Sequence, residues 1–294
     1  MTEPTAITAV ALPGTNVFAR PWTLDLGLPD FAAVRHEDIE PAVRAGMAVQ
    51  RSEWEAVASN EAEPTIANTV EALERSGELL DRVLTVLRTL TSATHCPDLD
   101  ELEEALAPEL SAHNDAYDLD TRLYRRFKAL DGLVRAARET GAEPVDADGA
   151  PIDEQTARLI RLAVEAFERD GVALTGADAD RLREINSRLT SLTTRFGTLA
   201  ANAMHAAGVA NFTATPDLVT TEPHAARVEL LTRAMSRGLE GEYDTRGLVV
   251  EIARLRAERA ALLGYPHHAA VVAAESAAGT TEAVVGMLRR LAPA

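Results

Sequence analysis

The sequence predicts an all-α protein, a multi-helix bundle. Ala, Leu, Glu and Arg dominate its 294 residues and only 4% are aromatic, a composition that favours helix. Apolar residues recur at spacings of three and four in two segments, 66–88 and 180–200, which is typical of helices with one buried face. With 46% apolar and 26% charged residues, the chain has the balance of a folded globular protein.

The first elements follow from proline and glycine. Residues 1–30 are rich in both and indicate an extended arm. Pro41 suits the first turn of a helix that we expect to run to about Ala58, because proline is tolerated where a helix begins.

The clearest helix is expected over 66–88. Its apolar face steps by four and three through Ile66, Val70, Leu73, Gly77, Leu80, Leu84 and Leu87. Gly77 lies within this face, where a missing side chain would let another helix approach closely, at some cost in helix propensity.

Further helices are expected from Pro97 and over about 119–139, followed by a turn-rich linker at 141–151 and a helix that ends near Gly171. Thr175 and Asp178 resemble a capping box. The helix behind them carries the second apolar face, which consists of Leu182, Ile185, Leu189, Leu192, Phe196 and Leu199.

The last third of the chain divides at an irregular stretch, 207–222. Helix resumes near Pro223, pauses at 238–241 and ends before Gly264, and Thr280 caps a final helix. The predicted organisation is therefore an arm at 1–30, a helical domain at 31–206, an irregular connector at 207–222 and a helical segment at 223–294.

Charge and cysteine content exclude several classes of protein. A net charge of −17 repels phosphate backbones and anionic lipid, so we expect neither nucleic acid nor membrane as a partner. Cys96 is the single cysteine, which rules out an intrachain disulfide and a Cys-rich metal site. The first twenty residues lack a basic segment before an apolar core, and no apolar run is long enough to span a bilayer. The expected location is the cytoplasm.

The chain lacks the helical H-E-x-x-H motif, which places two histidines one helical turn apart to hold zinc. The nearest match runs from His36 to Glu40, where glutamate replaces the second histidine. Since a catalytic zinc needs three protein ligands, we interpret this segment as the acidic start of a helix.

Other candidates are weaker. His267 and His268 are adjacent and point in different directions on a helix, and His95 and Cys96 are too close in sequence to meet as base and nucleophile. His113, His205 and His224 stand alone, and Glu101, Glu103, Glu104 and Glu109 read as a solvated helix face. We therefore predict no catalytic residue and no metal ligand in this chain, and the residues that would bind a substrate stay unknown.

Five segments in the same order resemble the thimet-oligopeptidase-type zinc metallopeptidases, which include peptidyl-dipeptidase and oligopeptidase A. The most specific is the run from Glu63 to Gly77, EPTIANTVEALERSG. The others are Asn16–Phe18 with Pro21-Trp22, Leu28–Ala42, Arg183–Phe196 and Leu255–Tyr265. Between Phe196 and Leu230 the chain is shorter than that family's pattern.

The resemblance implies the N-terminal, helical portion of a zinc peptidase that hydrolyses short peptides. It carries over no catalytic or metal residue, because the chain is expected to stop before the zinc motif, and zinc would be the cofactor of complete relatives only. The expected partners are short peptides or a complementary catalytic half, and the chain alone is expected to be inactive. Two alternatives stay open: a stand-alone helical peptide- or protein-binding module, and one chain of a split peptidase. Substrate specificity and oligomeric state are left open too.

Overall fold

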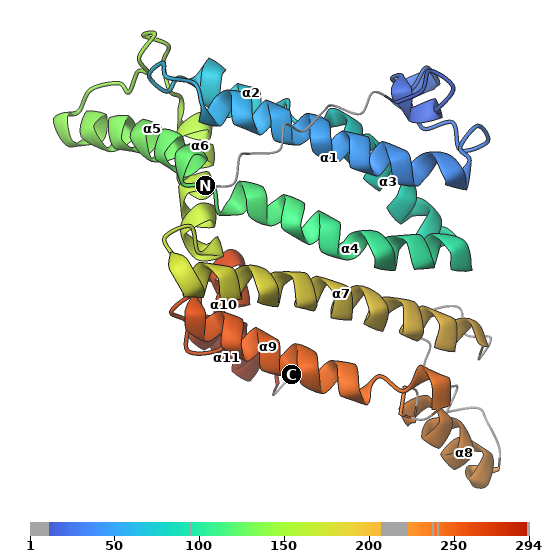
Figure 1. The fold of residues 1–294 in the computed structure, drawn as a ribbon. Helices are drawn as coiled ribbons and strands as arrows, with labels where there is room; N and C mark the ends of the chain where they lie inside the picture. The colour runs from blue at the N-terminus through green and yellow to red at the C-terminus, as the bar shows by residue number, and fades with distance from the viewer. Residues whose placement is uncertain (1–11, 95, 207–222, 237, 240, 293–294) are drawn as a thin grey trace. The chain divides into compact units, whose positions relative to one another are not determined.

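The computed structural model describes residues 12–94, 96–206, 223–236, 238–239 and 241–292, and over these it is built from helices without a β-strand (Figure 1). The prediction of an all-α, multi-helix fold is thereby confirmed. Over the same residues, none of the helices is both long and apolar enough to cross a lipid bilayer. The connector expected at 207–222 lies outside the described residues.

The chain forms two compact units. Unit 1 comprises residues 1–102 and 109–180, and unit 2 comprises residues 103–108 and 181–294, so α4 and α7 have residues in both. The helices of the first half are α1 His36–Ala58, α2 Ala72–Glu74, α3 Glu78–Ala93, α4 Pro97–Asp118, α5 Thr121–Thr140 and α6 Glu154–Asp170. The second half contains α7 Gly176–Ala206, α8 His224–Met235, α9 Arg246–Leu262, α10 His268–Glu275 and α11 Thr281–Leu291.

The core of unit 1 is aromatic at its centre. Phe167 of α6 lies 5.2 Å from the ring of Tyr117 and 5.9 Å from that of Phe127, between ring centroids. Buried side chains of α1, α5 and α6 surround these rings, among them Trp54, Leu123, Leu130, Val134, Ile160 and Val164. Burial of this set in one cluster is what orients α5 and α6 on α1.

Helices α1 and α3 pack side by side (Figure 1). The two helices come close at Gly46, where an added Cβ would lie 2.8 Å from the Cα of Leu80. A glycine is required here because the neighbouring atoms belong to the backbone of α3 and cannot rotate away. Val83 and Leu87 of α3 are buried in the same unit.

The helix expected at 66–88 is interrupted. Residues Ile66–Glu71 form a π-helical turn, α2 follows, and the chain breaks before α3, which Gly77 precedes with φ +82°. A Cβ on Gly77 would also collide with the amide of Gln50, 2.1 Å away. The predicted close approach at Gly77 is therefore present, but the group that approaches is the side chain of Gln50 and not the backbone of another helix. The break also shifts the buried face of the segment, so that Leu84 is only half-buried.

The start of α1 also differs from its expectation. The helix begins at His36, so Pro41 lies inside it rather than in its first turn. Asp38 stabilises this earlier start: its carboxylate accepts two hydrogen bonds from Arg35, at 3.0 and 3.1 Å, and its backbone carbonyl accepts one from Asn16. Asn16 and Phe18 are buried, so this part of the predicted arm is folded against α1.

In unit 2, α7 and α9 lie side by side through the apolar face that the sequence predicts over 180–200 (Figure 1). Ile185 and Leu192 of α7 contact the cluster that contains Ile252 and Leu255 of α9. Leu192 is 2% exposed, as predicted. The predicted helix signals hold here too, since Thr280 accepts a hydrogen bond from the backbone of α11.

Candidate functional site

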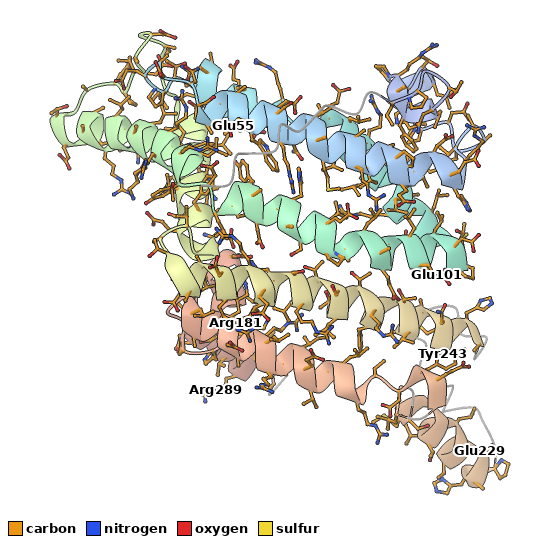
Figure 2. The ribbon with its side chains drawn as sticks, in the orientation of Figure 1. Glu55, Glu101, Arg181, Glu229, Tyr243 and Arg289 are labelled. Atoms are coloured by element: carbon orange, nitrogen blue, oxygen red, sulfur yellow. The ribbon has the colours of Figure 1, made fainter. Side chains whose placement is uncertain are left out.

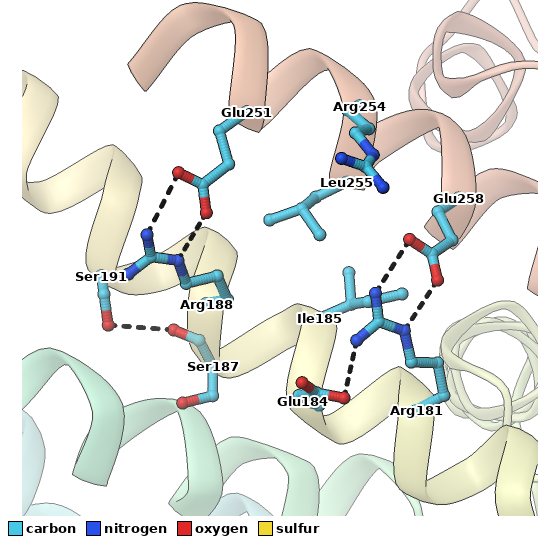
Figure 3. Close-up of a pocket in the computed structure, with 10 residues that line it drawn as sticks. All are labelled: Arg181, Glu184, Ile185, Ser187, Arg188, Ser191, Glu251, Arg254, Leu255 and Glu258. Carbon is cyan, nitrogen blue, oxygen red and sulfur yellow. Dashed lines mark hydrogen bonds and ion pairs between the residues drawn. The ribbon is translucent and has the colours of Figure 1, made fainter. Parts of the chain in front are cut away.

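A groove of about 550 Å³ lies between α7 and α9 in unit 2 (Figure 3). Its floor is apolar and includes Ile185 and Leu255. Its walls alternate in charge and are formed by Arg181, Glu184, Ser187, Arg188, Ser191, Glu251, Arg254 and Glu258. No histidine or cysteine is among the residues that line it.

Two bidentate ion pairs bridge the groove. The guanidinium of Arg181 donates to Glu258 at 2.7 and 2.9 Å, and that of Arg188 donates to Glu251 at 2.7 and 3.1 Å (Figure 3). The hydrogen bonds to arginine lower the pKa of both glutamates. Because both pairs are accessible to solvent, they add little to stability, and we interpret them as fixing the register of α7 on α9.

A second pocket, of about 290 Å³, lies in unit 1 against the aromatic core. Its lining comes from α1, α2, α4, α5 and α6 and includes Gln50, Trp54, Leu73, Glu74, Tyr117 and Phe127. Burial raises the pKa of Tyr117 to about 12, so its phenol stays neutral and can act only as a hydrogen-bonding group.

His113 is buried beside this pocket. Its ring stacks on Trp54 with centroids 4.5 Å apart. Arg51 donates from Nε to the Nδ1 of His113 at 3.2 Å, so the Nε2 of the ring carries the hydrogen and donates to Gln50 at 2.7 Å. Both ring nitrogens are thus used in holding α1 to α4, which makes His113 a structural residue.

This environment makes the stability of the protein depend on pH. Burial, with the nearby Arg51 charge, lowers the pKa of His113 from 6.5 to about 4. Below pH 6.5 the unfolded chain therefore gains a proton that the folded ring refuses, and the free energy of unfolding falls as the pH drops towards 4. We expect a loss of about 1–2 kcal/mol after allowance for solvent relaxation. Urea unfolding at pH 7 and pH 4.5 measures it.

Two histidine variants provide the control for this measurement. His113→Gln should show a smaller loss of stability between pH 7 and pH 4.5, whereas the exposed His224→Gln should behave as the parent. Equal pH dependence in His113→Gln and the parent would show that His113 does not cause it.

The structure separates the residues of the segment His36–Glu40. Glu40 forms an ion pair with Arg44 at 2.7 Å, whereas Nδ1 of His36 lies 3.8 Å from the sulfur of Cys96. His95 lies outside the described residues. The contact between His36 and Cys96 could not be predicted from the sequence, because the two residues are 60 positions apart and no local motif indicates it.

The pair His267-His268 is also divided between two roles. Nδ1 of His267 accepts a hydrogen bond from the backbone of Ala270 at 3.1 Å and so caps α10. His268 lies beside Arg256 and Arg259, and burial together with these charges lowers its pKa. Among all described residues, no group of three or more His, Cys, Asp or Glu is arranged to hold a metal ion.

The run Glu63–Gly77 has a structural role. Thr65 and Asn68 cap its first turn reciprocally, and the backbone of Ile66 donates to Asp146 of the 141–151 linker at 2.9 Å. Two nitrogens of Arg126 in α5 donate to the run, to Thr69 at 3.1 Å and to Asn68 at 2.7 Å, and the third donates to the carbonyls of residues 60 and 62 just before it. The most specific motif of the sequence is therefore a hydrogen-bonded junction of unit 1.

The chain matches several curated proteins along nearly its whole length. It is 29% identical to dipeptidyl carboxypeptidase of Escherichia coli over 95% of the chain, and 28% identical to that of Salmonella typhimurium over 90%. It is 24% identical to oligopeptidase A of Salmonella typhimurium over 92%. These matches support a relationship to the oligopeptidase family, of which the chain matches the N-terminal portion. No protein-family model matches it.

The family resemblance predicted from the five segments is thus confirmed, including its restriction to the N-terminal portion. The chain spans 44%, 42% and 44% of the three oligopeptidase relatives named above. More than half of each relative therefore has no counterpart in this sequence. The segments that reveal the family, Glu63–Gly77 above all, are those that build the helical core.

Proposed function

We propose that this chain supplies the helical N-terminal part of an oligopeptidase that cleaves short peptides. The observation that carries the proposal is the match over 90–95% of the chain to relatives named as dipeptidyl carboxypeptidases and oligopeptidases. The structural role of the run Glu63–Gly77 supports it, because this junction maintains the helical scaffold rather than a reaction centre. In the proposed enzyme the scaffold contributes helical walls beside which a peptide lies.

The described residues offer no site that fits zinc. The sequence contains no H-E-x-x-H motif, and the described residues that came closest are otherwise engaged: Glu40 with Arg44, and His267 with the start of α10. The described part of the chain also gathers no set of three metal-ligating side chains. We therefore assign no step of peptide hydrolysis to these residues and place catalysis on a complementary part of the enzyme.

A chimera tests this proposal. The matched N-terminal portion of the dipeptidyl carboxypeptidase of Escherichia coli is replaced by this chain, and release of dipeptides from a short peptide is measured with added zinc and with a chelator. We expect release that depends on zinc from the chimera, and from the isolated chain neither release nor one bound zinc per molecule by metal analysis.

The controls separate the alternatives. A chimera that folds, as judged by circular dichroism, yet releases no dipeptide with zinc present would contradict the proposal and favour a stand-alone binding module. Dipeptide release from a mixture of this chain with a separately expressed second part would support a split peptidase. One tightly held zinc in the isolated chain would contradict the assignment of the metal to another part.

A further inference from the structure

Helix α11 carries an apolar face that the described structure leaves uncovered. Val284, Met287, Leu288 and Leu291 are spaced by three and four, and Val285 widens the same arc. Val284 is half-buried, whereas Val285, Met287, Leu288 and Leu291 are 42%, 45%, 54% and 61% exposed. We call these four exposed side chains the α11 face. None of the residues of α11 is buried.

The remainder of α11 shows that this face is one side of a well-defined amphipathic helix. Thr280 caps its start, accepting a hydrogen bond from the backbone of Ala283 at 3.1 Å. The charged residues Glu282, Arg289 and Arg290 lie on the other side of the helix by their spacing, and Figure 2 labels Arg289. A helix of 11 residues is marginal in water by itself, so its stability depends on packing.

Helix α10, which packs against α11, also exposes an apolar side chain. Val272 of α10 is 54% exposed, whereas its neighbours Val271 and Ala273 are buried. Helix α10 packs against both α9 and α11, so Val272 belongs to the same part of unit 2 as the α11 face. Exposed apolar side chains that gather on neighbouring helices mark an interaction surface more often than a solvated one.

We infer that the α11 face binds the polypeptide equivalent to the portion of the oligopeptidase relatives that this chain does not span. This inference rests on the proposed function. The match takes up the N-terminal portion of the relatives and 44% of the Escherichia coli protein, so their remaining sequence follows the region of α11. A second copy of this chain is the less suitable occupant, because two molecules with a net charge of −17 repel each other.

Co-purification tests the inference. This chain is co-expressed with the part of the Escherichia coli dipeptidyl carboxypeptidase that it does not match, and the complex is captured through a tag on either chain. The variant Leu288→Glu/Leu291→Glu should weaken the complex by roughly 100-fold, because two carboxylates would be buried in an apolar contact. Leu133→Glu, at a similarly exposed position on α5, is the matched control and should bind as the parent.

Three results would contradict the inference about the α11 face. The inference is overturned if no complex forms, or if the double variant and the Leu133→Glu control are captured equally. It is also overturned if the parent chain alone forms a dimer that the double variant abolishes, since the face would then join two copies. Circular dichroism and thermal unfolding establish that the double variant is folded.

The same variants in the single-chain chimera distinguish the inference from the proposed function. Dipeptide release that the double variant leaves intact would keep the function and reject this face as the contact. A complex that depends on the α11 face, together with a chimera that releases no dipeptide, would keep the contact and reject the function.

Discussion

Replacing Arg126 by methionine should lower the free energy of unfolding by about 3–4 kcal/mol. Arg126 is 7% exposed, and its guanidinium donates to two carbonyls, to the hydroxyl of Thr69 and to the amide oxygen of Asn68, at 2.7–3.2 Å. Methionine fills much of the same volume but donates to none of them, so these buried and part-buried acceptors would lose the hydrogen bonds that Arg126 provides.

Arg125 provides the control for this prediction. It is the preceding residue of α5 and is exposed, so Arg125→Met makes the same chemical change in solvent and should cost less than ~0.5 kcal/mol. Urea unfolding followed by circular dichroism compares the two variants. Equal midpoints would show that the junction around the run Glu63–Gly77 does not depend on Arg126.

Two glycine-to-alanine substitutions should change stability in opposite directions. Gly46→Ala places a Cβ 2.8 Å from the Cα and 2.9 Å from the backbone nitrogen of Leu80, so α1 and α3 must move apart, at a cost of about 2–3 kcal/mol. Gly132 lies within α5 with no atom within 4 Å of an added Cβ. There alanine should add about 0.5–1 kcal/mol through its higher helix propensity.

Thermal and urea unfolding of the two alanine variants give this comparison directly. Because both substitutions exchange the same residues inside helices, propensity contributes equally to each and the difference reports the α1–α3 contact alone. A Gly46→Ala variant as stable as Gly132→Ala would mean that α3 can shift without penalty, contrary to the packing described here.

Helix class and helix ends were predictable because they depend on neighbours in sequence. Gly264, with φ +79°, follows α9, and Thr280 caps α11, both as the residue types indicate. The break before α3 was not predictable from the sequence. The apolar periodicity continues through Gly77, whereas the left-handed backbone of Gly77 is imposed by tertiary contacts. The amide of Gln50 occupies the space of a side chain there, and Glu53 accepts a hydrogen bond from the Gly77 backbone at 2.8 Å.

The polar contacts of the pockets were beyond sequence reasoning for a related reason. His113 reads as an isolated histidine, yet its partners Gln50 and Arg51 lie more than sixty residues earlier. The ion pairs of the α7–α9 groove likewise join residues 63 and 77 apart, and each glutamate and arginine resembles any other surface charge in the sequence. Only the fold selects which charges meet.

The junction around Glu63–Gly77 also constrains how the protein is made. Thr69 and Ile66 find their partners in Arg126 and Asp146, which are 57 and 80 residues further along the chain. During synthesis the run therefore leaves the ribosome well before Arg126 and Asp146 have been added to the chain. In that interval the hydroxyl of Thr69 and the backbone N–H of Ile66 form hydrogen bonds with water. Closure of the unit 1 core has to wait until the linker containing Asp146 has emerged, so the order of synthesis delays the segment by which the family is most readily recognised.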